Sequence, residues 1–222
     1  MTSLNTRPDP VDVDFARSAL IIVDMQNAFA SPGGMLDLAG VEISDAAQVV
    51  SSICSVADAF RLAGIQVVYL QMGYKADLRD AGGPNSPNHR KELAVCLMRK
   101  RPDLKGKLLT EGTWDFEIVD ELHSAPGDLV VVKNRYSGFA GTTLDAQLRV
   151  RGIQYLFFAG IAANVCVEST LRDAYFLEYW PILLSDGTMG AGDPNARSAT
   201  LFNVETFFGW TIKCEDLISS LR

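Results

Sequence analysis

The sequence predicts a single α/β domain in which a parallel β-sheet is covered by helices. Short apolar runs alternate along the chain with longer amphipathic ones, which is the pattern of parallel strands joined by crossover helices. The chain has 222 residues and a hydrophobic content of 48%, enough for one sizeable core without a second domain. We therefore treat residues 1–222 as one domain.

The strands are expected where short apolar runs occur. They are predicted over Ser18–Asp24, Gln66–Gln71, Asp128–Lys133, Tyr155–Ala159 and Trp180–Ser185.

Four helices are predicted between and after these strands. In the first, apolar residues recur at helical spacing before a glycine at the expected C-terminal position: Val49, Ile53, Ala57, Phe60 and Gly64. The second runs over Thr143–Arg151 and is closed by Gly152. The third begins at Val165 with Asn164 as its N-cap, and the fourth runs over Pro194–Phe207.

Two segments lie outside this pattern. Residues 1–17 are polar and interrupted by prolines, and we interpret them as an N-terminal extension. Residues 72–91 contain the turn-forming run from Gly82 to Asn88 and have neither helical nor strand periodicity. Long loops inside a domain are usually lids or binding segments, so we expect residues 72–91 to be a lid loop.

Charge and cysteine content exclude several classes of protein. The net charge is −7, which disfavours nucleic acid and anionic membrane surfaces as partners. The longest run without strongly polar side chains, Tyr155–Ala163, is too short to span a bilayer. Cys54, Cys96, Cys166 and Cys214 are widely spaced and form no disulfide or zinc pattern. We expect a cytoplasmic protein that forms a homo-oligomer.

Three reactive side chains follow predicted strands. Asp24 and Lys133 end the first and third strands, and Cys166 follows the fourth after a short turn. Alone, each has a common structural role: a turn former, a solvated strand end and a small buried side chain. Ligands of open α/β sheets bind beyond the carboxyl ends of the strands. The occurrence of all three reactive side chains at such ends therefore favours a catalytic site.

These residue types suit nucleophilic catalysis. Cys166 is expected in the first turn of a helix, where backbone amides and a nearby Lys133 ammonium would stabilise a thiolate. Asp24 would accept and return the proton. His89 lies in the lid loop and His123 near a predicted surface helix, so neither is the expected base.

The motifs Leu20–Gln26, Lys133 and Gly160–Val167 resemble, in order and spacing, the pattern of isochorismatase-like hydrolases. The resemblance covers Ala19–Trp210. It implies a three-layer α/β/α fold with a mostly parallel six-stranded sheet.

The resemblance also implies the roles of the site residues. Asp24, Lys133 and Cys166 would form the catalytic triad of a cysteine hydrolase. The peptide bond between Ile161 and Ala162 would be cis, and the amides of Ala162 and Cys166 would form an oxyanion hole.

Within this superfamily the chain most resembles ureidoacrylate amidohydrolases, which release aminoacrylate and carbamate. The segments that carry the resemblance are Pro32–Gly34, Leu36–Gly40, Ala81–Pro84, Arg135–Phe139, Cys166–Asp173 and Glu205–Trp210. Gln71–Tyr74 and Ala140–Gly141 depart from the pattern, so biuret and triuret hydrolases are the alternative. Tyr74–Asp77 lacks the metal-binding cluster of nicotinamidases, and we expect no metal or cofactor.

Side chains of the lid loop and neighbouring strand ends are expected to contact a small ureide substrate. The candidates are Phe29, Gln71, Met72, Tyr74, Asp80, Asn88 and Tyr136. Arg90, Lys91 or Arg135 would hold a carboxylate if the substrate is ureidoacrylate. A non-catalytic ligand-binding relative is a remoter alternative that the intact triad disfavours. A thiol redox protein is disfavoured because no resolving cysteine lies near Cys166 in the sequence.

Overall fold

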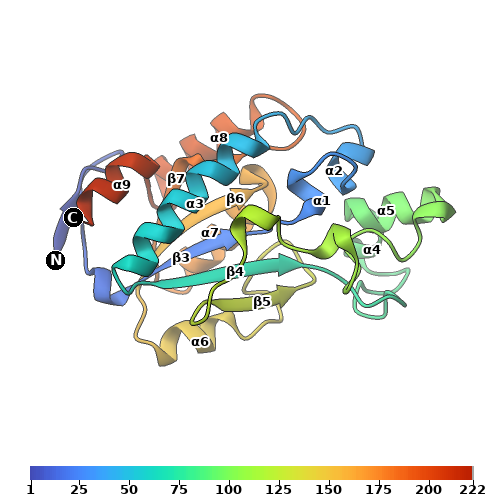
Figure 1. The fold of residues 1–222 in the computed structure, drawn as a ribbon, viewed down its shortest axis with the longest axis horizontal. Coiled ribbons are helices and arrows are strands. Elements are labelled where there is room, and N and C mark those ends of the chain that lie inside the picture. Colours follow the sequence, from blue (N-terminus) through green and yellow to red (C-terminus); the bar gives the residue numbers. More distant parts are fainter. Residues whose placement is uncertain (222) are drawn as a thin grey trace.

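The computed structural model describes residues 1–221 and has a six-stranded parallel sheet at its centre (Figure 1). Its strands are β3 (Ser18–Val23), β4 (Gln66–Met72), β5 (Leu129–Lys133), β6 (Tyr155–Ile161), β7 (Trp180–Met189) and β8 (Trp210–Ile212). The strand order is β5-β4-β3-β6-β7-β8, and every neighbouring pair is parallel. The five strands expected from the apolar runs are confirmed. β8 was not predicted from the pattern, because three residues are too short to show one.

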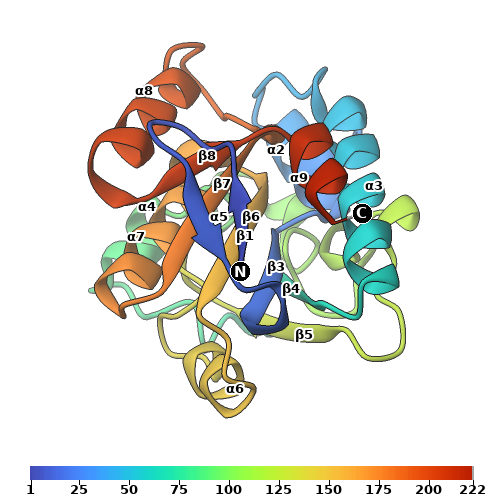
Figure 2. The ribbon, with the colours of Figure 1, turned by 90° about the vertical axis from the view of Figure 1, so that its left-hand side faces the viewer.

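Helices cover both faces of the sheet, which gives the expected three-layer α/β/α fold (Figure 2). They are α1 (Asn27–Ala30), α2 (Met35–Leu38), α3 (Ala46–Leu62), α4 (Pro87–Lys91), α5 (Leu93–Lys100), α6 (Leu144–Val150), α7 (Glu168–Phe176), α8 (Ala196–Asn203) and α9 (Cys214–Ser220). Buried side chains of α3 and α9 pack on one face of the sheet, and those of α6 and α7 pack on the other.

Helix α3 shows why the periodic pattern was informative. Val49, Ile53, Ala57 and Phe60 are all buried against the sheet, as their spacing predicted. Gly64 follows the helix with φ +69°, a conformation that glycine adopts without the steric cost of a side chain.

The other predicted helices begin or end elsewhere. The prediction of Asn164 as an N-cap is wrong: residues Ala163–Val167 form a π-helical turn before α7, and the Asn164 side chain binds Ala191 instead. The predicted helix Pro194–Phe207 is shorter, because α8 ends at Asn203 and a π-helical turn follows.

Residues 1–17 are packed onto the domain. β1 (Thr2–Leu4) and β2 (Val11–Val13) form an antiparallel hairpin. Leu4 and Val13 are fully buried, and a bridge joins Arg7 to Thr211 beside β8. The extension therefore covers the end of the sheet where both termini lie (Figure 1).

Residues 72–91 are also more ordered than their composition indicated. The segment ends in α4, so the expectation that it contains no helix is wrong. The Asn88 side chain donates to the hydroxyl of Tyr74 and to the carbonyl of Ala81, at 3.1 and 3.0 Å. Both partners are fully buried, so these bonds hold the loop against the domain.

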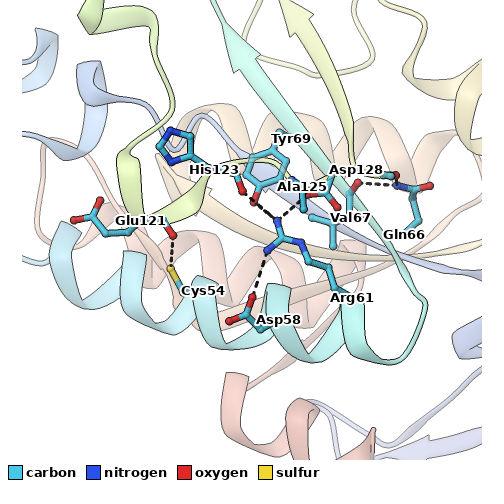
Figure 3. Close-up of polar contacts among 11 residues, drawn as sticks. Cys54, Asp58, Arg61, Gln66, Val67, Tyr69, Glu121, His123, Ala125 and Asp128 are labelled. Atoms are coloured by element: carbon cyan, nitrogen blue, oxygen red, sulfur yellow. Dashed lines mark hydrogen bonds and ion pairs between the residues drawn. The ribbon is translucent and has the colours of Figure 1, made fainter.

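A guanidinium network lies at the amino ends of β4 and β5 (Figure 3). Arg61 Nη2 donates to Asp128 Oδ2 at 2.7 Å and to the Tyr69 hydroxyl at 2.9 Å. Asp128 also accepts the amide of Ala125 at 2.8 Å. Burial raises the pKa of Tyr69 to about 12, so the hydroxyl stays neutral.

We expect Arg61→Ala to lower the free energy of unfolding by about 2 kcal/mol, because the buried Asp128 carboxylate loses a charged donor. Catalytic constants should stay unchanged, since the network lies away from the carboxyl ends of the strands. Urea unfolding measures the first effect. Arg151→Ala, which removes an exposed arginine bound to the Gln147 carbonyl, should change stability by less than about 0.5 kcal/mol. Equal stability of the two variants would contradict this account.

Candidate active site

The candidate site lies where the chain connections diverge, between β3 and β6. From β3 the chain continues to β4 on one side, and from β6 to β7 on the other, which leaves a crevice at their carboxyl ends. The two strands approach so closely here that a Cβ on Gly160 would lie 2.1 Å from the Val23 carbonyl oxygen. Only glycine fits at this position.

Asp24 follows β3 directly and is fully buried. Its φ of +52° turns the chain sharply, a conformation that Asp tolerates better than most residues. The Asp24 amide donates to Leu70, and its carbonyl accepts the Gln26 amide, at 2.9 and 2.8 Å. The buried Gln26 side chain in turn bonds the Met72 amide at 2.7 Å and the Met72 carbonyl at 2.8 Å, which fixes this turn to the end of β4.

Lys133 ends β5, two strands from Asp24, and reaches it across β4. It lies beside Met72 in the sheet register, and Nζ is 3.6 Å from the Met72 sulfur. Nζ donates to Asp24 Oδ2 at 2.7 Å and to the Arg135 carbonyl at 3.3 Å. Both charged side chains are 0% exposed, so this is a fully buried ion pair.

Cys166 lies in the π-helical turn after β6 and is 4% exposed. The Thr170 hydroxyl donates to the Cys166 carbonyl at 2.6 Å and accepts the Gly138 amide at 3.0 Å, which anchors the turn. The thiol lies close enough to Asp24 and Lys133 to influence the pKa of both. The structure therefore brings together all three residues expected to form the triad.

Burial and the ion pair oppose one another in this cluster. Burial raises the pKa of Asp24, and the Lys133 ammonium partly reverses that effect. Burial by itself lowers the pKa of Lys133. Asp24 and Cys166 have the larger combined effect, so the pKa of Lys133 is raised. Among the described residues, Asp24 Oδ1 has no hydrogen-bond donor. The short distance between the two groups favours the ionised form of each, and one carboxylate oxygen remains able to accept a proton.

The expectation of a preformed Cys166 thiolate is not supported. Burial raises the pKa of the Cys166 thiol well above its ordinary value, and Lys133 offsets this only in part. Asp24 adds to the increase, because a second negative charge beside the first is unfavourable. The thiol is therefore protonated at neutral pH and must lose its proton during the reaction.

The turn before Cys166 has the expected backbone geometry. The peptide bond between Ile161 and Ala162 is cis. The Ala162 carbonyl accepts the amides of Val165 and Val167 at 3.0 and 3.1 Å. Within residues 1–221, the Ala162 amide donates to no backbone or side-chain acceptor, so it is available to a ligand.

A cavity of about 230 Å³ opens onto the nucleophile. It is lined by Phe29, Met35, Leu36, Val41, Glu92, Leu93, Tyr136, Ala162, Val165, Cys166, Ala191 and Gly192. This volume is below the ~300–1,000 Å³ of pockets for drug-sized ligands, so the cavity suits a small molecule. Phe29 and Tyr136 are the expected substrate contacts that lie in this lining.

The remaining expected contacts lie outside the lining. Gln71 binds the Phe116 carbonyl, and Met72 lies behind Lys133. Tyr74 and Asn88 bind each other, and Asp80 accepts the Lys75 amide. These side chains hold the loop and strand ends that surround the cavity, and their positions do not support direct substrate contact.

The candidate carboxylate-binding cations lie elsewhere too. Arg90 and Lys91 are exposed on α4, and Arg135 binds the Asp80 and Asn134 carbonyls. None of them lines the cavity. Glu92 does line it and was missed, because a glutamate before a helix resembles an ordinary cap in sequence.

Within residues 1–221, no group of three or more His, Cys, Asp and Glu side chains is placed to hold a metal ion. In the same part of the chain, every helix is too short or too polar to cross a membrane.

Known proteins share this sequence pattern and fold. The isochorismatase domain family matches residues 18–216. A cysteine hydrolase from Pseudomonas syringae pv. phaseolicola 1448A is 27% identical, covers 94% of both chains and has a TM-score of 0.79. N-carbamoylsarcosine amidase from Thermoplasma acidophilum is 28% identical over 90% of this chain and 97% of its own, with a TM-score of 0.68. Nicotinamidase from Bacillus subtilis is 25% identical over 89% and 99%, with a TM-score of 0.71.

The family match covers most of the chain, and the similar structures include cysteine hydrolases and amidases. This protein therefore belongs to the isochorismatase family, within the isochorismatase-like superfamily of cysteine hydrolases and amidases.

Proposed function

We propose that this protein is a cysteine amidohydrolase that cleaves a C–N bond of a small linear ureide without a cofactor. The observation that carries the proposal is the buried Lys133–Asp24 ion pair beside the Cys166 thiol, at the base of a small cavity. This arrangement supplies a nucleophile, a proton acceptor and a fixed positive charge at one point.

In the first half of the reaction, Cys166 attacks the ureido carbonyl carbon. The thiol proton passes to Asp24 as the S–C bond forms, because the protonated thiol is a weak nucleophile. The amides of Ala162 and Cys166 hold the oxygen on which negative charge develops. Asp24 then gives the proton to the leaving nitrogen as the C–N bond breaks.

In the second half, water replaces the amine. Asp24 takes a proton from the water, whose oxygen attacks the thioester-like carbon, and the S–C bond breaks with the proton returned to Cys166. Lys133 keeps Asp24 ionised between these steps, because its ammonium opposes the effect of burial on the carboxyl pKa. The acid released is a carbamate when the leaving group is the substituted nitrogen.

Sequence motifs and the similar proteins support a ureide as the substrate. The motifs resemble those of ureidoacrylate amidohydrolases, and one similar structure is an N-carbamoylsarcosine amidase. Ureidoacrylate, cleaved to aminoacrylate and carbamate, is one candidate; triuret and biuret, which would release ammonia, are the other. All three present a planar ureido carbonyl to the nucleophile.

A substrate panel tests this proposal. We expect ammonia release from at least one linear ureide and no turnover of isochorismate or nicotinamide. Cys166→Ala should reduce ureide turnover by about 10³-fold or more, because the attacking atom is lost, while Cys54→Ser should retain it. Rapid turnover of isochorismate or nicotinamide with every ureide inert would overturn the proposal.

Asp24→Asn should lower kcat by about 10²–10⁴-fold, because an amide cannot accept and return the proton. Circular dichroism should show a folded variant, because asparagine keeps the shape of the side chain, and urea unfolding should show a lower stability, because the buried Lys133 ammonium loses its partner. A kcat within threefold of wild type would show that another group transfers the proton.

Lys133→Met should shift the acid limb of the kcat/KM profile to higher pH by about one unit or more. Asp24 must be ionised to act as a base, and loss of the ammonium raises its carboxyl pKa further. The Cys166 thiol pKa should rise as well, so the rate of alkylation by iodoacetamide should also need higher pH. Profiles that coincide with those of wild type would contradict the electrostatic role of Lys133.

A further inference from the structure

The cavity contains one carboxylate that the proposed mechanism does not use. Glu92 lies between α4 and α5, is 2% exposed and lines the cavity together with Cys166. Its Oε1 accepts the Ala94 amide at 3.1 Å, and its Oε2 accepts the Val95 amide at 2.8 Å. Each carboxylate oxygen accepts two donors, so Glu92 can bind further N–H groups while it caps α5.

The other side chains that line the cavity are uncharged. Burial raises the pKa of Tyr136, which also lines the cavity, and the nearby Glu92 carboxylate adds to the increase. Lys, Arg and His are missing from the lining residues, and the nearby Lys133 is already paired with Asp24. A substrate carboxylate in this cavity would therefore meet Glu92 without a free cation to balance it.

The surface beside the cavity carries negative charge too. A neighbouring hollow of about 290 Å³ shares Gly192 with the cavity lining. Its lining includes the carboxylates of Glu42, Asp45 and Asp193, and Arg197 is the one cation there. The Arg197 side chain donates to the carbonyls of Thr188 and Ser185, so it is directed to backbone oxygens. The resulting field disfavours the approach of anions.

Ureides with a terminal amide fit this arrangement better than ureides with a terminal acid. An amide N–H pairs with a buried carboxylate through a charge-assisted hydrogen bond. A carboxylate in the same position repels it and loses its own hydration. The discrimination should be large, because a buried polar group left without its partner is costly.

We propose that Glu92 is a specificity-determining residue that accepts the distal N–H groups of an uncharged ureide and excludes ureides that carry a carboxylate. This inference rests on the proposed ureide hydrolysis at Cys166. It favours biuret- or triuret-like substrates over ureidoacrylate.

A matched pair of substrates tests the inference: 3-ureidopropionamide and 3-ureidopropionate, which share the ureido carbonyl and differ in the charge of the distal group. Near neutral pH, we expect wild-type kcat/KM to be higher for the amide by about tenfold or more. In Glu92→Gln the preference should shrink, through a higher KM for the amide and a lower KM for the acid, with kcat little changed. Glu92→Ser should show the same loss of preference as Glu92→Gln, and serine is a good N-cap that can replace the capping role of Glu92.

Glu215→Gln is the matched control. It removes the same charge from exposed α9, at the end of the molecule away from α4 and α5 (Figure 1), and should keep the wild-type preference. A wild-type preference for the acid, or a preference that both Glu92 variants retain, would overturn the role of Glu92 while leaving ureide hydrolysis intact. Failure of the wild type to cleave this pair, biuret, triuret and ureidoacrylate would overturn both proposals.

Discussion

The buried ion pair between Lys133 and Asp24 is the interaction on which the site depends. Two charges at 0% exposure lose their hydration, and they are tolerated because their charged atoms lie 2.7 Å apart. The pair links the ends of β5 and β3 across β4, so the geometry of three strands is fixed at one point. Removal of either partner would leave an uncompensated charge in the interior, which is why the two residues act as a unit.

The same pair determines the proton distribution around the nucleophile. In the cluster, one negative and one positive charge already cancel, and ionised Cys166 would add an excess negative charge in a buried place. The free protein therefore keeps the thiol neutral, which also limits its oxidation. Attack then requires proton transfer to Asp24, whose Oδ1 is available because Lys133 binds Oδ2.

Rigid hydrogen bonding supports these groups from outside the cavity. Gln26 holds the turn after β3 to β4, and Asn164 joins the π-helical turn to Ala191 through bonds of 3.0 and 2.9 Å. Thr170 connects Cys166 to the loop after β5. Gln26, Asn164 and Thr170 hold the reacting groups in position from outside the cavity. Glu92 and Tyr136 supply polar side chains to the cavity lining.

The sequence by itself determined the α/β class, the positions of five strands along the chain and the identity of Asp24, Lys133 and Cys166 as a group. Apolar periodicity and strand-end positions are local features, so they can be read without coordinates. The tertiary structure alone decided which side chains line the cavity. The sequence predicted Gln71 and Asn88 as substrate contacts, but their amides bind protein carbonyls and a hydroxyl. Glu92, which the sequence did not distinguish from an ordinary helix cap, lines the cavity. A polar side chain binds whichever partner the fold brings within reach, and that partner comes from a distant part of the chain.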